Sequence, residues 1–228
     1  MRYGKAQITI SDLWDGISKD SELFIINGNI YKKLQLQKIL ELSVHAMIIQ
    51  VQPDLNKQIK FTVKSDGIQN PDFYTTFDET YQVYSSSVGD VVTYTFSDTN
   101  VKTLYMTGRI GFELAENNPL VDVIHWGDNN KLCYFSKFFK NFSKKSILAY
   151  DSPDIQYVST LFQTFYASNI SFDMNSLDTA NIMGLNQAYR YSNAPNLAFQ
   201  YPTFKNVVNL DRAFSEITNA TINWDDLS

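Results

Sequence analysis

One pattern recurs four times in the C-terminal half of this chain, and it restricts the possible folds more than any other feature of the sequence. Each copy places an apolar residue, a second apolar residue three positions later and an aromatic residue four positions after that. Successive copies are 26, 24 and 25 residues apart, and all three columns keep these intervals. The copies span residues 132–139, 158–165, 182–189 and 207–214. One such unit cannot bury its apolar face alone, so the pattern predicts stacked units that share a core.

The spacing inside each copy predicts a short helical or 3₁₀ turn, because positions three and four apart share one face of a helix. A further apolar column follows the aromatic residues among Asn, Asp and Ser residues, which is typical of a short strand with its turn. This column consists of Ile147, Phe172, Leu197 and Ile222. A turn and a strand in about 25 residues predict a leucine-rich-repeat-like solenoid over residues 119–228.

The segment from residue 46 to residue 118 has the pattern of a small all-β sandwich. Short runs that are apolar, or that alternate between apolar and polar residues, are separated by turn-forming pairs such as Pro53-Asp54 and Asp66-Gly67. Several short strands separated by such turns are typical of small β-sandwiches. We expect strands within residues 46–52, 58–67, 79–87, 90–98 and 102–108. The predicted fold class is therefore α+β and β-rich, with a small all-β sandwich followed by the solenoid.

Residues 1–45 are predicted to form an N-terminal arm or hairpin that serves as an anchoring segment. Two β-prone runs flank Asn27-Gly28, which is the strongest two-residue hairpin signal. Residues 37–52 fit either a helix that passes into a strand or one long strand. The N-terminus has no apolar segment of the secretory type, so we expect no signal peptide. No apolar run reaches the roughly 18 residues that a membrane-spanning helix needs.

The charge of the chain argues against nucleic acid as a partner. The net charge is −5, and the 19 Lys and Arg residues are scattered, whereas a phosphate-binding surface concentrates basic side chains. The densest basic stretch, residues 137–145, alternates Lys with Phe. Such a stretch fits a nucleic-acid reader or a solenoid turn with buried Phe and solvated Lys side chains, and we favour the second interpretation.

The residues that could support catalysis are few and scattered. His45 and His125, the only histidines, fall in different predicted domains and outside the sequence contexts of catalytic triads. Cys133 lies among apolar residues and is predicted to be a buried thiol. His125 precedes Trp126, and we expect the pair to pack at the junction of the two domains. The sequence therefore predicts a non-enzymatic protein.

No metal or cofactor site is predicted. Asp78-Glu79 and Asp225-Asp226 contain oxygen ligands suited to Ca²⁺, but adjacent side chains on a strand point to opposite faces, and solvated turn carboxylates are the preferred interpretation. The pair Gly108-x-x-Gly111 lacks the Lys and the helix start of a phosphate-binding loop.

Residues 177–189, LDTANIMGLNQAY, follow an order that is found in one known family. They resemble the unit of BspA-type leucine-rich repeat surface proteins, roughly Trp-Asp-Thr-Ser-x-Val-x-x-Met-x-x-Met-Phe. The Trp-Asp opening recurs at Trp224-Asp225 and, loosened, in residues 125–128, whereas the Met positions are mostly Leu or Phe. Residues 90–110 resemble the closing strands of the PKD-like β-sandwich that often precedes these repeats. The Trp-Gly-Asp-Gly turn of PKD domains is absent, and residues 77–80 lie near its place.

The resemblance implies adhesion or protein binding rather than catalysis. Candidate contact residues lie beside the repeat columns, at Tyr166, Arg190 and Tyr191, because Tyr and Arg often dominate binding energies. Trp224 lies where a next repeat would stack and is a fourth candidate. Ordinary packing within the repeats is the alternative interpretation of these side chains.

We expect a structural component of a bacteriophage virion, in a head, tail or fibre. A virion protein needs no export signal, whereas BspA-type proteins on cells are exported. A bacterial cell-surface adhesin is the alternative, and a carbohydrate-active enzyme on a β scaffold is a third hypothesis. The expected partners are other virion subunits or further copies of this chain, or else a host surface protein or glycan. The expected location is the virion or, alternatively, the cell surface.

Overall fold

The computed structural model describes residues 23–26, 29–32, 45–77, 80–82, 87–128, 130–174, 177–193, 196–198, 205–217 and 221–223. The chain divides into two compact units, Met1–Val44 and His45–Ser228. In the first unit, β1 (Leu23–Ile26) pairs antiparallel with β2 (Asn29–Lys32). Ile26 pairs with Asn29, so the hairpin predicted at Asn27-Gly28 is confirmed.

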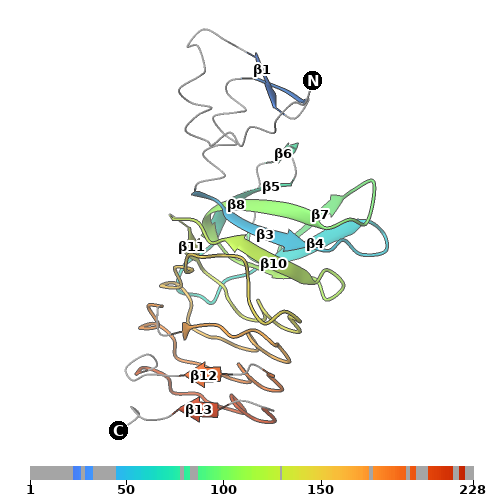
Figure 1. Ribbon diagram of the computed structural model, residues 1–228. Helices are drawn as coiled ribbons and strands as arrows, with labels where there is room; N and C mark the ends of the chain where they lie inside the picture. Colours follow the sequence, from blue (N-terminus) through green and yellow to red (C-terminus); the bar gives the residue numbers. More distant parts are fainter. Residues whose placement is uncertain are drawn as a thin grey trace. The chain divides into compact units, whose positions relative to one another are not determined.

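Two antiparallel sheets form the N-terminal part of the second unit (Figure 1). The larger sheet has the strand order β10-β3-β8-β5-β6, with β11 joined to β8 in parallel, and the smaller sheet has the order β7-β4-β9. The strands are β3 (Met47–Val51), β4 (Gln58–Val63), β5 (Asp72–Phe77), β6 (Thr80–Gln82), β7 (Val91–Thr95), β8 (Lys102–Ile110), β9 (Phe112–Leu114), β10 (Leu120–His125) and β11 (Lys131–Leu132).

The two sheets bury their facing side chains against each other. Along β4, Ile59, Phe61 and Val63 are buried while the intervening residues are partly exposed, as the two-residue period of a strand requires. The ring of Phe61 lies 6.4 Å from that of Phe73 in the other sheet. The hydroxyls of Thr75 and Tyr94 form a buried hydrogen bond between the sheets. The predicted β-sandwich character is therefore present.

The expected strands correspond to five of the observed ones, whereas β5, β9, β10 and β11 were not predicted. The sheet continues past the predicted domain boundary at residue 118, because β10 pairs with β3. Residues 37–44 lie outside the described residues, so the structure describes only the strand β3 in the ambiguous stretch 37–52. None of the helices within the described residues is long and apolar enough to cross a membrane.

The repeated part contains hydrogen-bonded turns where helical turns were predicted. Four turn segments recur, and alternate N–H groups in each donate three residues back, as Tyr166 does to Gln163. In the first three segments the intervening N–H groups donate to the next segment, as Phe165 does to Ala188 at 2.8 Å. In an α-helix these N–H groups would bond to carbonyls of their own segment. The predicted helical turns are therefore absent from these four segments, which are instead turns bonded to one another. The turn segments are residues 136–141, 162–167, 186–191 and 211–216.

The four segments stack, and the aromatic column forms a continuous ladder. The rings of Phe139, Phe165, Tyr189 and Phe214 are stacked nearly parallel to one another. The centroids of successive rings are 5.7, 4.8 and 5.5 Å apart. Leu185 and Tyr189 are buried, as the repeat register predicts. The later apolar column forms strands in its last two copies, where Leu197 of β12 (Asn196–Ala198) pairs with Ile222 of β13 (Thr221–Asn223) (Figure 1).

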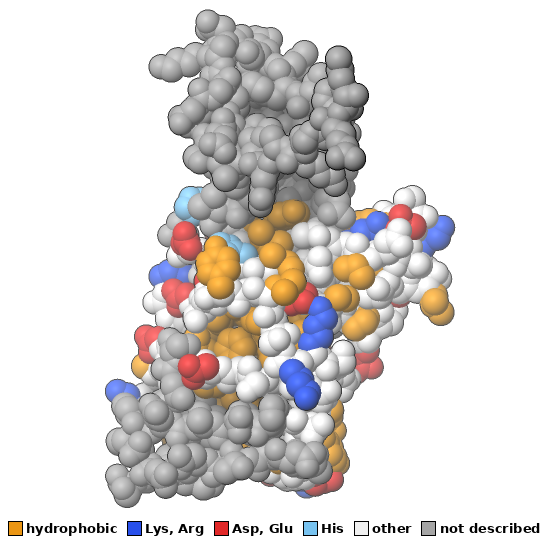
Figure 2. Space-filling view, in the orientation of Figure 1, with side chains coloured by type: hydrophobic (Ala, Val, Ile, Leu, Met, Phe, Trp, Pro, Cys, Tyr) orange, Lys and Arg blue, Asp and Glu red, His pale blue; other side chains and the backbone are white. Residues whose placement is uncertain are grey.

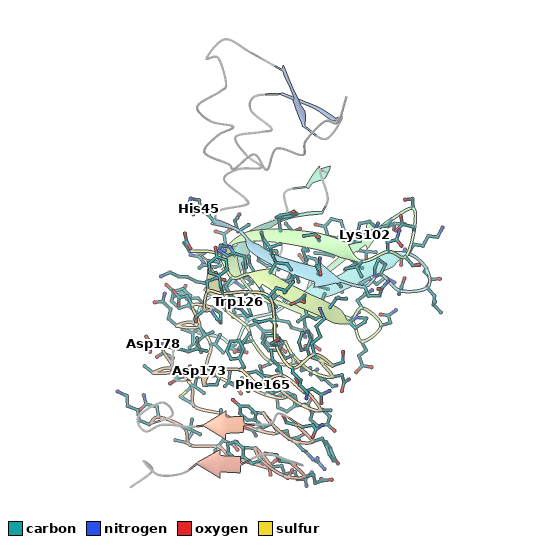
Figure 3. All side chains as sticks on the ribbon, viewed as in Figure 1. His45, Lys102, Trp126, Phe165, Asp173 and Asp178 are labelled. Atoms are coloured by element: carbon teal, nitrogen blue, oxygen red, sulfur yellow. The ribbon has the colours of Figure 1, made fainter. Side chains whose placement is uncertain are left out.

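The sandwich and the turn ladder share one hydrophobic core. Trp126, at the end of β10, is buried, and its indole packs against Phe135, Phe138 and Phe139 of the first repeat, at ring distances of 5.9, 5.4 and 6.2 Å. Figure 3 shows Trp126 between the strands of the sandwich and the level of Phe165. The packing of Trp126 at this junction agrees with the expectation from the sequence.

Candidate functional site

Five side chains from successive turn segments form a continuous row, which we call the tyrosine strip: Lys140, Tyr166, Arg190, Tyr191 and Glu216. The Lys140 ammonium lies 5.8 Å from the centre of the Tyr166 ring. The rings of Tyr166 and Tyr191 meet edge to face at 5.3 Å. Arg190 lies 4.6 Å from the centre of the Tyr191 ring and donates a hydrogen bond to its hydroxyl at 2.8 Å.

The C-terminal end of the strip is held by an ion pair. Arg190 donates to Glu216 at 2.7 Å. This hydrogen bond holds the pKa of Glu216 below its ordinary range, and it raises the pKa of Arg190. The Glu216 side chain is 53% exposed and that of Arg190 19% exposed, so solvent screens the pair, which orders the side chains more than it stabilises the fold. Tyr191 remains 39% exposed and available to a partner.

The turn backbone sets the direction of these side chains. The second and sixth residues of every turn segment have positive φ, and Tyr191 is one of them at 59°. Three residues without positive φ separate these two positions, and in the second and third segments the third and fourth residues are buried while the residues on either side of them are partly or fully exposed. Tyr189 is thus buried, while Tyr191 lies on the surface. Backbone hydrogen bonds on both sides of segment 186–191 fix this arrangement.

A groove of about 320 Å³ lies beside the strip, between β9 and the first turn segment. Two ion pairs join its walls, Glu113 with Lys137 at 2.8 Å and Glu116 with Lys140 at 3.7 Å. Burial opposes the ionisation of Glu113, but hydrogen bonds from Lys137 and Tyr134 outweigh it and hold its pKa below the ordinary range. The lysines of the basic stretch that line this groove are therefore already paired. Figure 2 shows acidic, basic and apolar side chains interspersed over the described part of one face.

The structure brings three of the four predicted contact residues together. Tyr166, Arg190 and Tyr191 are neighbours in the strip, whereas Trp224 lies outside the described residues. Lys140 and Glu216 were missed, although their positions follow from the repeat: Lys140 is one residue after the aromatic column, like Tyr166 and Arg190, and Glu216 is two residues after it, like Tyr191. The carboxylates of the sandwich that pair with the lysines carry no repeat signal.

The histidines and the cysteine lie apart from the strip. His125 is buried, with Nδ1 3.1 Å from the carbonyl of Ala46 and Nε2 3.4 Å from Asp151. The Asp151 carboxylate also accepts the N–H groups of Trp126 and Gly127, so it holds the junction together. Cys133 is fully buried, and desolvation raises the pKa of its thiol to about 11. Such a thiol is unsuited to nucleophilic attack.

The described residues contain no cluster of three or more His, Cys, Asp or Glu side chains suited to a metal ion. Of the predicted turn carboxylates, Asp78-Glu79 and Asp225-Asp226 lie outside the described residues. Comparison of the chain with protein-family models, with curated proteins and with solved structures finds no match.

Proposed function

We propose that this chain is a non-enzymatic structural and binding protein that contacts other protein subunits through the tyrosine strip. The observation that carries this proposal is the ordered row of Tyr166, Arg190 and Tyr191 on a rigid, hydrogen-bonded framework. Tyr contributes a large contact area at low cost in entropy, and Arg contributes several hydrogen bonds, and both residues often dominate binding. The hydrogen bonds of Arg190 to Tyr191 and Glu216 already restrict its side chain.

The proposal includes the leucine-rich-repeat assignment of the repeated part. Segments stacked every 24 to 26 residues, each with a turn and an apolar column that forms parallel strands at Leu197 and Ile222, support a solenoid of the BspA type. We place the chain in a bacteriophage virion as a head, tail or fibre component. The BspA resemblance favours a second candidate, a bacterial surface adhesin that binds a host protein or glycan.

Sedimentation velocity of the full chain over a range of concentrations tests the proposal. A virion subunit that contacts its own copies through the strip forms concentration-dependent assemblies. The double substitution Tyr166→Ala with Tyr191→Ala is expected to abolish them. Tyr150→Ala is the matched control, because Tyr150 is 89% exposed and lies near His125, away from the strip.

Electron microscopy of the assemblies then shows whether they are regular particles or fibres. A chain that remains monomeric at every concentration, and that binds a glycan array in a manner dependent on Tyr191, would contradict the virion proposal and support the adhesin. Assemblies that survive the double substitution would contradict the role of the strip.

A further inference from the structure

One column of the repeats is exposed in a later copy and covered in the earlier ones. The residue after the first apolar column is Cys133, Ser159 or Met183 in the first three repeats. Met183 is 53% exposed, whereas Ser159 is partly buried and Cys133 is fully buried. The register of the repeats is the same at all three positions, so residues from outside the repeats cover the first two.

The cover comes from the loop between β4 and β5, of which we call residues 64–70 the latch loop. The N–H group of Asp66 donates to the carbonyl of Cys133 at 3.0 Å, and the hydroxyl of Ser159 donates to the carbonyl of Asp66 at 3.2 Å. The carboxyl group of Asp66 accepts hydrogen bonds from the backbone of Ser159 and Thr160. Asp66 therefore ties the latch loop to the first two repeats, while residues 67–70 are exposed.

The carboxyl group of Asp66 lies where its charge is poorly solvated. One of its oxygens is buried without a hydrogen-bond partner among the described residues. Burial raises the pKa of Asp66 from 3.8 to about 7, and the hydrogen bonds from Ser159 and Thr160 oppose this shift only in part. In an open loop the carboxylate is hydrated and has its ordinary pKa. Ionisation of Asp66 therefore favours the open loop.

Ionisable side chains from neighbouring elements face this site. Cys133 and Tyr134 lie just after β11, and burial raises the pKa of both groups. The charged side chains of the surrounding elements are Lys64 of the latch loop, Arg109 of β8 and Asp72 of β5. Arg109 is paired with Asp72 at 3.4 Å. Since burial keeps Cys133 and Tyr134 neutral, Asp66 is the group in this set whose charge changes between about pH 5 and about pH 8.

We propose that the latch loop is a pH-sensitive latch, which covers Cys133 and Ser159 in acid and opens locally when Asp66 loses its proton. The opening equilibrium grows with pH until about pH 7 and levels off above it, because the ionised carboxylate then favours the open loop by a constant amount. The sandwich and the ladder stay joined in the open state, since the packing of the Trp126 indole on the first repeat does not involve the latch loop. This device is independent of the tyrosine strip.

Chemical modification of Cys133 gives the first test, because it is the only cysteine of the chain. The full chain is treated with dilute iodoacetamide, whose iodide the thiolate displaces, and mass spectrometry gives the rate. The rate for the natural chain is divided by the rate for Asp66→Asn, which cancels the ionisation of the thiol itself. This ratio is expected to rise about hundredfold between about pH 5 and about pH 8. A constant ratio overturns the proposal.

Asp72→Asn is the matched control. Asp72 is the first residue of β5, at the end of the same loop, but its side chain is 57% exposed and pairs with Arg109. Because this carboxylate is already hydrated, the variant is expected to keep the pH profile of the natural chain. If Asp72→Asn flattens the profile as much as Asp66→Asn does, the profile reflects the net charge of the chain, and the proposal is overturned.

The urea dependence of the modification rate at about pH 8 gives the second test, and it uses the natural chain alone. A local opening exposes little surface, so the rate is expected to rise far less steeply with urea than the equilibrium constant of global unfolding does. A slope equal to that of global unfolding would mean that Cys133 reacts only from the unfolded chain, and this result overturns the proposal.

Discussion

Burial of Asp66 couples the stability of the folded chain to pH. This residue lies in the loop after β4, and its side chain faces the backbone of Ser159 and Thr160 in the second repeat. Desolvation raises its pKa from 3.8 to about 7, although hydrogen bonds from these two backbone groups oppose the shift. One carboxylate oxygen is buried without a hydrogen-bond partner among the described residues.

The sign of the effect follows from this raised pKa. The folded chain binds a proton at Asp66 more tightly than the unfolded chain does, so the contribution to stability is present below about pH 4 and is lost as the pH rises through 7. Asp66→Asn removes the ionisation, and its advantage over the natural chain is expected to grow across this interval to about 4 kcal/mol. Urea unfolding at a series of pH values measures this difference. Parallel pH profiles for the two chains would contradict it.

Leu185 and Leu210 occupy the same position in successive repeats but differ in burial. Leu185→Ala is expected to lower the unfolding free energy by about 2–5 kcal/mol, because it leaves a cavity in the core. Leu210→Ala should cost less than about 1 kcal/mol, because that side chain is mostly exposed. Chemical denaturation of both variants measures the contrast. Equal costs would show that the last repeat is as well covered as the others.

At the scale of the turn segments, backbone conformation determines whether a substitution by Gly raises or lowers the free energy of unfolding. Ala167 has a positive φ of 51°, which is unfavourable for an L-residue with a Cβ atom. Ala188 is fully buried and is not among the residues with positive φ. Ala167→Gly is therefore expected to raise the unfolding free energy by about 0.5 kcal/mol, whereas Ala188→Gly lowers it by about 1 kcal/mol. Thermal unfolding of the two variants tests the opposite signs.

The repeat columns could be predicted at this scale because burial depends on residue type and interval. Phe139, Phe165, Tyr189 and Leu185 are buried as the register requires, whereas Phe214 of the last repeat is only partly buried. The strands on either side of Asn27-Gly28 form the predicted hairpin. The conformation inside each repeat could not be predicted from the same intervals. Spacings of three and four residues fit a helix, but they also fit consecutive turns in which Gln163 and Ala167 take positive φ. Only the hydrogen bonds between segments distinguish the two.

The unpredicted strands have a related explanation. β9 has only three residues, Phe112–Leu114, too few for a period of two to be evident. β10 lies within the range predicted for the solenoid, residues 119–228, yet the buried Asn118 side chain bonds to Gln52, Gln58 and Lys60 and ties the preceding turn to the sandwich. Likewise, the repeat pattern located Tyr166, Arg190 and Tyr191, but it could not reveal Glu113 or Glu116, which come from outside the repeats.

At the scale of the whole second unit, Trp126 joins the sandwich to the turn ladder. Its indole contacts three Phe rings of the first repeat, while its backbone N–H is held by Asp151. A shared core of this kind couples the unfolding of both parts, so amides in β8 and in segment 186–191 are expected to exchange through the same global opening. The covered junction explains why a ladder of four segments is stable at its sandwich end.

Trp126→Ala removes most of this coupling. We expect the free energy of opening for segment 186–191 to fall by about 3–5 kcal/mol, while amides in β8 keep most of their protection, because the sandwich retains its own core around Phe61 and Phe73. Native-state hydrogen exchange measures both quantities in one experiment. Tyr150→Ala serves as the control, since that ring lies at the same junction but is exposed. An equal loss of protection in β8 and in the ladder would mean that the two parts unfold together even without the indole, and that the ion pairs and Asp151 are sufficient to couple them.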